Sequence, residues 1–363
     1  MTRSLLPIVL KTLSLLLILT AITLFVTDMA QADSPRRQLT YFSQRYRDSR
    51  VNIVDIDRRL TVVLLSTDGL VTNMAWSPDG ERLALNIYTE TGIYELRLFE
   101  IGHLEVEILN QQWVSHSALS WSPDGMHTAF TRRENSQSQV FVVDTTDGAL
   151  IPIAPELQNT SGPSWSPDGT QLAFAGQGFT GESEIFALDM ACLESGCPPR
   201  RLTGNPATDH MPVWSPDGTH IAFVSNRDVF PLVHVMAAEC GQAFCVPHQV
   251  NTLRVTSEPP VWSPDSRWLV VSVDTATNGV DSTLQLVDTQ TWATYRITRE
   301  RNALNVVSWS ADSQLVAYIA DFMNIMDVMV QEVDCIVMQA ACAADALPVT
   351  QHNANVWGPV WRP

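Results

Sequence analysis

One five-residue sequence, WSPDG, recurs along this chain and constrains its fold more than any other feature. WSPDG begins at Trp76, Trp121, Trp165 and Trp214, and related forms follow as WSPDS at Trp262 and WSADS at Trp309. Successive tryptophans are 45, 44, 49, 48 and 47 residues apart. A period of roughly 40 to 50 residues is typical of solenoid and propeller arrays.

Each WSPDG sequence has the residues of a tight β-hairpin. In residues 211–227, MPVWSPDGTHIAFVSNR, an apolar run meets Pro-Asp-Gly and is followed by alternating apolar residues. Pro216 presets φ for the first central turn position, Asp217 tolerates the second, and Gly218 accepts the positive φ that follows a type I turn. The sequence therefore predicts two strands joined by this turn, with each Trp at the end of the first.

Two further short strands complete each unit. The third is predicted at VFVVD (140–144), IFALD (185–189) and LQLVD (284–288). The fourth is predicted at an Arg-apolar-Thr pattern, which occurs at 201–203, 254–256 and 296–298. Four strands per unit are typical of a propeller blade, and no helical period of comparable length competes.

The two ends of the chain supply complementary parts of one more blade. LTYFSQR (39–45) aligns with the second strand IAFVSNR (221–227), and 51–55 and 61–65 match strands three and four. The missing first strand is found in NVWGPVWRP (355–363), which places Trp361 where other units have their Trp. Pairing the ends would protect two exposed sheet edges. We therefore predict an all-β, seven-bladed β-propeller whose terminal strands share one blade, with six blades as the alternative.

These units resemble the TolB-type, WD-like β-propeller repeat over residues 39–363. The resemblance is specific for fold and implies a role in the cell envelope beside a peptidoglycan-associated lipoprotein. The TolB architecture that this resemblance implies has six blades preceded by a separate domain. In this sequence we instead expect seven blades, with only a linker at 33–38 between the predicted signal peptide and the propeller. Because such repeats occur in many unrelated proteins, the resemblance alone does not fix an activity.

The first 32 residues have the pattern of a signal peptide. Arg3 and Lys11 precede an apolar stretch, and Ala30-Gln31-Ala32 has the small residues of a cleavage site. The uncharged run 12–27 has 16 residues, which is short of the roughly 20 that span a bilayer. We expect cleavage, no stable membrane span and an extracytoplasmic location, either periplasmic or secreted; an uncleaved anchor is the alternative.

The charge balance limits the partners of the chain. A formal net charge of −17 disfavours nucleic acid and anionic membranes, and it also suits any soluble secreted protein. Lys11 is the only lysine, so a chain cleaved after Ala32 has no lysine for Schiff-base or phosphate-loop chemistry.

Six cysteines occur as three close pairs between strands three and four of three units. The pairs are Cys192 with Cys197, Cys240 with Cys245, and Cys335 with Cys342. Three local disulfides are the simplest interpretation of an exported chain. A zinc site is the alternative, but these spacings bring no histidines into register with the cysteines.

The sequence lacks the common catalytic signatures GxSxG, HExxH, GxGxxG and the phosphate loop. Four residues before each Trp, where strand one enters the channel, lies a predicted polar ring: Thr72, Ser117, Ser161, His210, Glu258, Asn305 and Trp357. His210 and Glu258 come from adjacent blades, so an acid/base pair or part of a metal site is conceivable. A hydrated channel lining is favoured over both, and we predict no catalytic residue, no metal and no cofactor.

The loops between strands two and three should open on the same face as this ring. GQGFTG (176–181), with Phe179, and DFMNIM (321–326) would present apolar groups there to a protein or peptide. DTATNGVD (274–281) resembles half of a calcium loop but lacks its terminal glutamate.

The leading hypothesis is a monomeric, non-catalytic, extracytoplasmic propeller that binds a protein or peptide. Its candidate binding residues are His210, Glu258, Asn305, Trp357 and Phe179. The alternatives are a channel-mouth hydrolase or lyase with a site assembled from several blades, and the propeller of a peptidase whose catalytic domain lies elsewhere.

Overall fold

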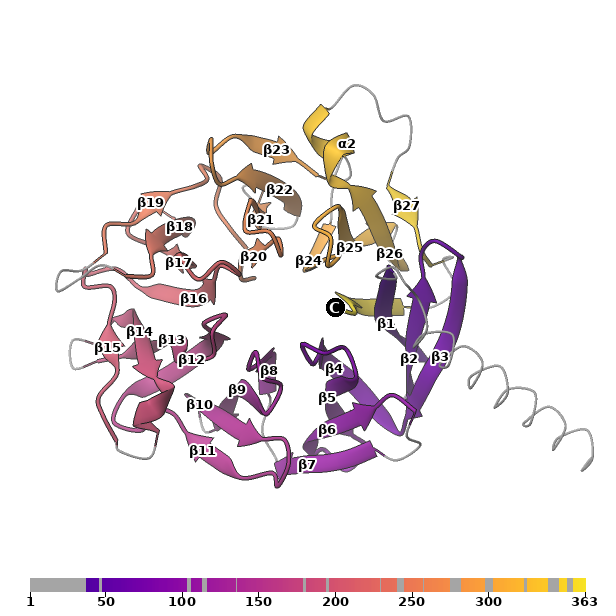
Figure 1. The fold of residues 1–363 in the computed structure, drawn as a ribbon, viewed down its shortest axis with the longest axis horizontal. Coiled ribbons are helices and arrows are strands. Elements are labelled where there is room, and N and C mark those ends of the chain that lie inside the picture. The colour runs from indigo at the N-terminus through magenta and orange to yellow at the C-terminus, as the bar shows by residue number, and fades with distance from the viewer. Residues whose placement is uncertain are drawn as a thin grey trace, which may run out of the picture.

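Seven four-stranded antiparallel sheets form a ring in the computed structural model (Figure 1). The structure describes residues 37–45, 48–102, 106–112, 116–134, 136–178, 181–193, 196–228, 230–239, 245–256, 258–274, 282–297, 303–322, 325–338, 346–350 and 355–363. The first strand of each blade faces the centre of the ring and the fourth lies at its periphery. The predicted all-β, seven-bladed propeller is confirmed.

The blades are numbered in chain order and their strands are given from the centre outwards. Blade 1 contains β28 (Asn355–Trp361), β1 (Gln38–Arg45), β2 (Asp48–Asp55) and β3 (Leu60–Thr67); blade 2 contains β4 (Gly69–Trp76), β5 (Arg82–Thr89), β6 (Tyr94–Glu100) and β7 (Val106–Gln112). Blade 3 contains β8 (His116–Trp121), β9 (His127–Glu134), β10 (Gln137–Asp144) and β11 (Leu150–Pro152); blade 4 contains β12 (Gln158–Trp165), β13 (Gln171–Gln177), β14 (Ser183–Asp189) and β15 (Arg200–Arg201).

Blade 5 contains β16 (Asp209–Trp214), β17 (His220–Ser225), β18 (Leu232–Ala237) and β19 (His248–Gln249). Blade 6 contains β20 (Val261–Trp262), β21 (Trp268–Asp274), β22 (Ser282–Asp288) and β23 (Thr294–Arg296); blade 7 contains β24 (Ala303–Trp309), β25 (Leu315–Phe322), β26 (Ile325–Glu332) and β27 (Leu347–Pro348). Two short helices, η1 (Met190–Cys192) and α2 (Val333–Met338), lie between strands three and four of blades 4 and 7.

The chain ends close the ring as the sequence predicts. Strand β28 pairs antiparallel with β1, with Leu39 opposite Trp361 and Phe42 opposite Trp357. Gly358 has a φ of 58°, and a Cβ added there would lie 2.6 Å from Cε1 of Phe42. Glycine is therefore required for the close approach of the two terminal strands.

The hydrophobic core lies between neighbouring blades, because each sheet is covered on both faces by its neighbours. Between blades 1 and 2, for example, Phe42 and Ile53 pack with Leu83, Leu85 and the repeated Trp76. Burying a side chain of this size stabilises the fold by about 1.5–3 kcal/mol. Similar clusters recur between neighbouring blades around the ring, so the core is divided among the interfaces between blades.

The repeated turn has the predicted geometry. Gly218 has a φ of 74°, and its N–H donates to the carbonyl of Ser215 at 2.9 Å. Where the glycine is replaced, Ser266 and Ser313 still adopt positive φ, of 60° and 59°. The hydroxyl of each also accepts a hydrogen bond from the N–H of the aspartate in the preceding turn, Asp217 and Asp265.

Consecutive strands of each blade are antiparallel, so the connections between them alternate between two faces of the ring. We call the face that carries the WSPDG turns the turn face; it also carries the connections between strands three and four. The opposite face, which we call the channel face, carries the start of every first strand and the connections between strands two and three. The predicted polar ring therefore belongs to the channel face.

One predicted strand was wrong. Residues 254–256 were expected to be the fourth strand of blade 5, but that strand is β19, and the N–H of Val250 continues it by donating to Val233. Val255 instead makes an isolated bridge with Val273 of blade 6. The likeness to residues 201–203 was misleading because blade 5 uses Asn251, whose side-chain oxygen accepts from the N–H of Val233, where blade 4 uses Thr203.

The disulfide prediction is confirmed for Cys192 and Cys197, which are bonded on the connection between β14 and β15. Cys245 and Cys335 are also disulfide-bonded, while their expected partners, Cys240 and Cys342, lie outside the described residues. The predicted signal peptide at 1–32 lies outside them too. Within the described part of the chain, no helix is long and apolar enough to cross a membrane.

Candidate functional site: the channel face

The predicted polar ring is only partly within the described structure. Thr72 is exposed and its hydroxyl donates to the carbonyl of Asn86 at 3.2 Å. Ser161 is half-buried. Trp357 is half-buried as well and packs against the core between blades 1 and 2. The side chains of Ser117 and Asn305, and all of Phe179, lie outside what the structure describes, so their predicted roles remain predictions.

His210 and Glu258 both have environments that favour their uncharged forms. Burial lowers the pKa of His210, against opposing effects of the nearby Asp209 charge and a backbone hydrogen bond at Thr208. Burial raises the pKa of Glu258. Among the described residues no hydrogen bond or ion pair joins the two side chains. A charged acid/base pair is thus not preformed in this structure.

His210 has one polar atom without a partner. Its Nδ1 is buried and makes no hydrogen bond within the described residues. The next residue, Met211, has a φ of 55°, a left-handed conformation that costs a non-glycine residue of order 1 kcal/mol or more. Such a conformation persists only where surrounding contacts hold it.

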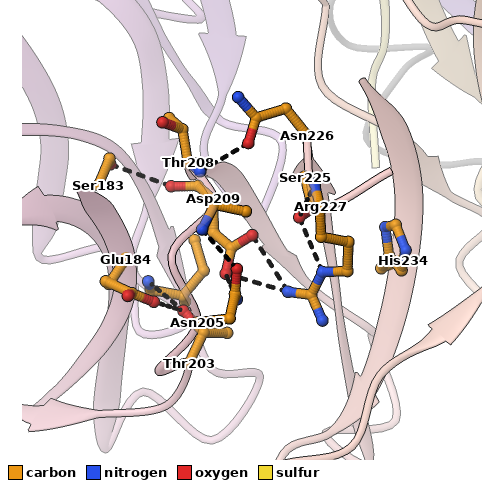
Figure 2. A network of polar contacts seen from close by, with 12 residues as sticks. Ser183, Glu184, Thr203, Asn205, Thr208, Asp209, Ser225, Asn226, Arg227 and His234 are labelled. Carbon is orange, nitrogen blue, oxygen red and sulfur yellow. Dashed lines mark hydrogen bonds and ion pairs between the residues drawn. The ribbon is translucent and has the colours of Figure 1, made fainter. Parts of the chain in front are cut away.

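Those contacts come from a network around Asp209 that sequence reasoning missed (Figure 2). The carboxylate of Asp209 is fully buried and accepts two hydrogen bonds from Nη2 of Arg227, at 3.1 and 3.0 Å. It also accepts one from Nδ2 of Asn205 at 2.9 Å. Because an unpaired buried carboxylate is costly, these donors stabilise the position of the chain immediately before His210.

The network crosses from blade 5 to blade 4. The hydroxyl of Ser183, at the start of β14, donates to the carbonyl of Asp209 at 3.0 Å. The hydroxyl of Thr208 donates to Glu182 at 3.0 Å, and the N–H of Thr208 donates to the side-chain oxygen of Asn226 at 2.7 Å. Two connections of the channel face are thereby fixed to each other.

A second buried carboxylate lies beside this network in blade 4. Glu184 is 1% exposed and is bonded to Arg201, and it also accepts a hydrogen bond from the hydroxyl of Thr203 at 2.6 Å. Figure 2 shows Glu184 and Thr203 close to Asn205. Buried ion pairs and hydrogen bonds therefore join blades 4 and 5 at the channel face.

On the far side of Arg227, His234 closes the network. Its ring is 3% exposed and stacks on Phe223 with ring centroids 5.8 Å apart. The guanidinium of Arg227 also lies over Phe223, 5.2 Å from the ring centroid. Nε2 of His234 lies 3.3 Å from Oδ2 of Asp228. Burial, and then the charge of Arg227, lower the pKa of His234 against the opposing effect of nearby carboxylates.

The sequence held one signal for this network. Once 221–227 is recognised as a second strand, antiparallel pairing places its end beside the start of strand one, and Asp209 is indeed opposite Ser225. Arg227 then lies next to Asp209. The burial of that aspartate could not be foreseen, because neighbouring aspartates in the WSPDG turns are exposed.

The channel face also presents apolar side chains to solvent. Four large hydrophobic residues on its connections or at the adjoining strand ends are between 38% and 39% exposed: Tyr88, Phe230, Leu253 and Ile325. Ile325 belongs to the predicted DFMNIM segment. Phe230 and Leu253 lie on neighbouring connections, which are joined by a hydrogen bond from the N–H of Val255 to the carbonyl of Pro231. Within the described residues, no group of three or more histidine, cysteine, aspartate or glutamate side chains is arranged to hold a metal ion.

Comparisons with known proteins agree with this architecture. Residues 120–254, which span most of blades 3 to 5, match the family model of the TolB beta-propeller domain. TolB from Acinetobacter baumannii superposes with a TM-score of 0.55 at 18% identity, covering 93% of this chain and 85% of that one. None of the curated proteins matches the chain.

Several structural neighbours are enzymes, among them an oligogalacturonate lyase and a peptidase. An oligogalacturonate lyase in complex with manganese has a TM-score of 0.59 at 15% identity, over 76% of this chain and 80% of that one. A puromycin-hydrolysing peptidase from Mycobacterium tuberculosis has a TM-score of 0.63 at 13% identity, over 88% of this chain and 54% of that one. At these identities the likeness establishes the fold alone.

Proposed function

The chain is a TolB-like β-propeller, and from that premise we propose that it is a non-catalytic module that binds a protein or peptide at its channel face. The observation that carries the proposal is that the channel face combines connections held by buried ion pairs with exposed apolar side chains. The Asp209–Arg227 and Glu184–Arg201 ion pairs hold the connections of blades 4 and 5 in place. Phe230 follows Arg227 by three residues, and its side chain and that of Leu253 on the neighbouring connection are partly exposed to solvent. A preorganised surface loses less entropy on binding.

We further propose that the protein works outside the cytoplasm. The Cys192–Cys197 disulfide supports this location, because such bonds persist mainly in oxidising compartments. The TolB-like fold supports the same location by analogy. A partner in the cell envelope, as the resemblance to TolB implies, is part of the same proposal.

The test compares matched substitutions on the two faces. Phe230→Ala or Trp357→Ala should weaken capture of the partner by more than about 1 kcal/mol, as buried aromatic anchors usually do. Val246→Ala is the control, because Val246 is 92% exposed on the turn face. Binding is measured by titration of a partner isolated from envelope extract, and thermal unfolding of each variant checks the fold. Equal losses from both faces would contradict the proposal.

A channel-mouth enzyme is the second candidate, and the unpaired Nδ1 of His210 is the observation that favours it. For the binding function, His210→Ala should have little effect on partner affinity, and Glu258→Gln is measured beside it as a test of turnover. If either variant abolished turnover of a peptide or glycan while binding and folding were unchanged, the enzyme would replace the binding module as the conclusion.

A further inference from the structure

A cavity of about 420 Å³ lies between blades 1 and 7, separate from the residues of the channel-face network. Blade 1 contributes Tyr41, Asn52 and Val54 to its lining, and the chain around β27 contributes Leu347 and Val349. The two walls are far apart in sequence and belong to different sheets. Cavities of roughly 300–1,000 Å³ are the usual size of small-molecule sites.

Six of the twelve residues that line the cavity are apolar and six are polar. Val54, Ile56 and Val349 provide aliphatic surface. The polar groups satisfy one another: Nδ2 of Asn52 donates to the hydroxyl of Ser43 at 3.2 Å and to the carbonyl of Arg50 at 3.1 Å. Burial raises the pKa of Tyr41, against a hydrogen bond with Thr61, so this phenol stays neutral. With aliphatic and polar groups side by side, these walls suit an amphipathic molecule.

Arg59 is the one charged residue that lines the cavity. It makes no hydrogen bond or ion pair within the part of the chain that the structure describes. The adjacent Arg58 differs, because its N–H donates to Oδ1 of Asp55 at 2.9 Å and its Nε lies 3.9 Å from Oδ2 of the same residue. In a chain of net charge −17, an exposed arginine without a carboxylate partner beside the aliphatic side chains of this cavity can select an anionic ligand.

We propose that this cavity binds a small amphipathic carboxylate, with the carboxylate paired to Arg59 and the apolar body between the two blades. A guanidinium matches a carboxylate with two parallel hydrogen bonds, whereas a multiply charged ligand would bury charge against aliphatic walls. A cavity of about 420 Å³ is within the usual range for a site that binds one small molecule. An acyl chain of about ten carbons with one carboxylate combines the apolar body and the single negative charge that this site requires.

This inference goes beyond the proposed partner binding, and it has a consequence for the fold. A ligand that contacts both walls binds the closed ring and not the unfolded chain. It should therefore raise the unfolding temperature in proportion to the logarithm of its concentration.

The experiment uses the full chain with decanoate as the probe and decanamide as its uncharged counterpart. Decanoate should bind by calorimetry and raise the unfolding temperature, and decanamide should bind about fivefold more weakly, the upper range for a solvent-exposed ion pair. Arg59→Gln should remove the difference between the two probes. Arg58→Gln is the matched control and should retain it.

A second variant tests the location independently of charge. Leu347→Trp adds volume to the cavity at a residue that is already 39% exposed, so the fold should tolerate it, and both probes should lose binding. Equal affinity of decanoate and decanamide for the unsubstituted protein would overturn the role of Arg59. No binding of decanoate, or binding unchanged in both Arg59→Gln and Leu347→Trp, would overturn the site. Neither outcome bears on partner binding at the channel face.

Discussion

The two faces of this propeller use polar side chains in opposite ways. On the turn face the same bonds recur in blade after blade: the serine hydroxyl donates to the aspartate two residues later, at 2.6 Å from Ser166 to Asp168, from Ser215 to Asp217 and from Ser310 to Asp312. On the channel face the Asp209 network occurs once. The corresponding positions, five residues before the other repeat tryptophans, are Val71, His116, Thr160, Ser257, Leu304 and Val356.

The recurrent bonds hold the ring together. The indole N–H of Trp121 donates to the carbonyl of Ala75 at 3.0 Å, and that of Trp262 donates to Val213 at 3.1 Å, in each case in the preceding blade. The residues that make the repeat recognisable are thus occupied by contacts within and between blades. The Asp209 network, by contrast, distinguishes blades 4 and 5 at the channel face, which is where we propose recognition.

The largest expected effect comes from breaking the ring where its ends meet. Deleting residues 355–363 removes β28 and with it the contacts of Arg362, whose Nε donates to the carbonyl of Gly80 at 2.7 Å. The edge of β1 would then be unpaired, and we expect loss of the cooperative unfolding transition. Chemical denaturation followed by tryptophan fluorescence measures this. An unchanged midpoint and slope would show that the closing strand contributes nothing to stability.

A smaller effect on stability is expected when the buried Asp209 network is disrupted, and a smaller one still when the exposed turn bonds of Asp217 are weakened. Arg227→Met leaves the fully buried carboxylate of Asp209 with Asn205 but without its cation, and should destabilise the protein by about 3 kcal/mol. Asp217→Asn is the matched change on the turn face and should cost about 1 kcal/mol or less, because the exposed bonds of that turn are partly replaced by water. Urea unfolding compares the two. Equal costs would remove the energetic distinction between the faces.

The sequence predicted the parts of the fold that depend on the repeat. The hairpin turn, the seven blades and the sharing of one blade by the two chain ends follow from residue patterns that recur in each unit. The failures are at positions without a repeat. Residues 254–256 looked like a fourth strand because three residue types matched, although the pairing is decided by Asn251 and its bond to β18.

The site was harder to predict for the same reason. His210 and Glu258 were predicted from their register alone. The register also brings Arg227 next to Asp209, but no local pattern shows that Asp209 is buried. The burial of Asp209 depends on the packing of blade 5 against blade 4, where the hydroxyl of Ser183 donates to the carbonyl of Asp209. The cavity beside Arg59 depends on the packing of two blades even more, since its walls come from opposite ends of the chain.

The smallest expected effect is a difference in the pH windows over which the two faces lose stability. Burial lowers the folded-state pKa of His234 below its unfolded value of about 6.5. The unfolded state therefore takes up the proton first, and stability falls as the pH drops below about 6.5 until the folded-state pKa is reached. On the turn face, hydrogen bonds from Ser166 and from the N–H of Thr170 lower the pKa of Asp168. The contribution of Asp168 to stability is complete above the unfolded-state pKa of about 3.9 and is lost as the pH falls through the folded-state pKa.

Urea unfolding between pH 3 and 8 should thus show a slope of stability against pH near pH 6 that His234→Gln reduces, and a separate slope below about pH 4 that Asp168→Asn reduces. If His234→Gln changed only the acidic slope, the assignment of the upper window to the buried network of the channel face would be wrong.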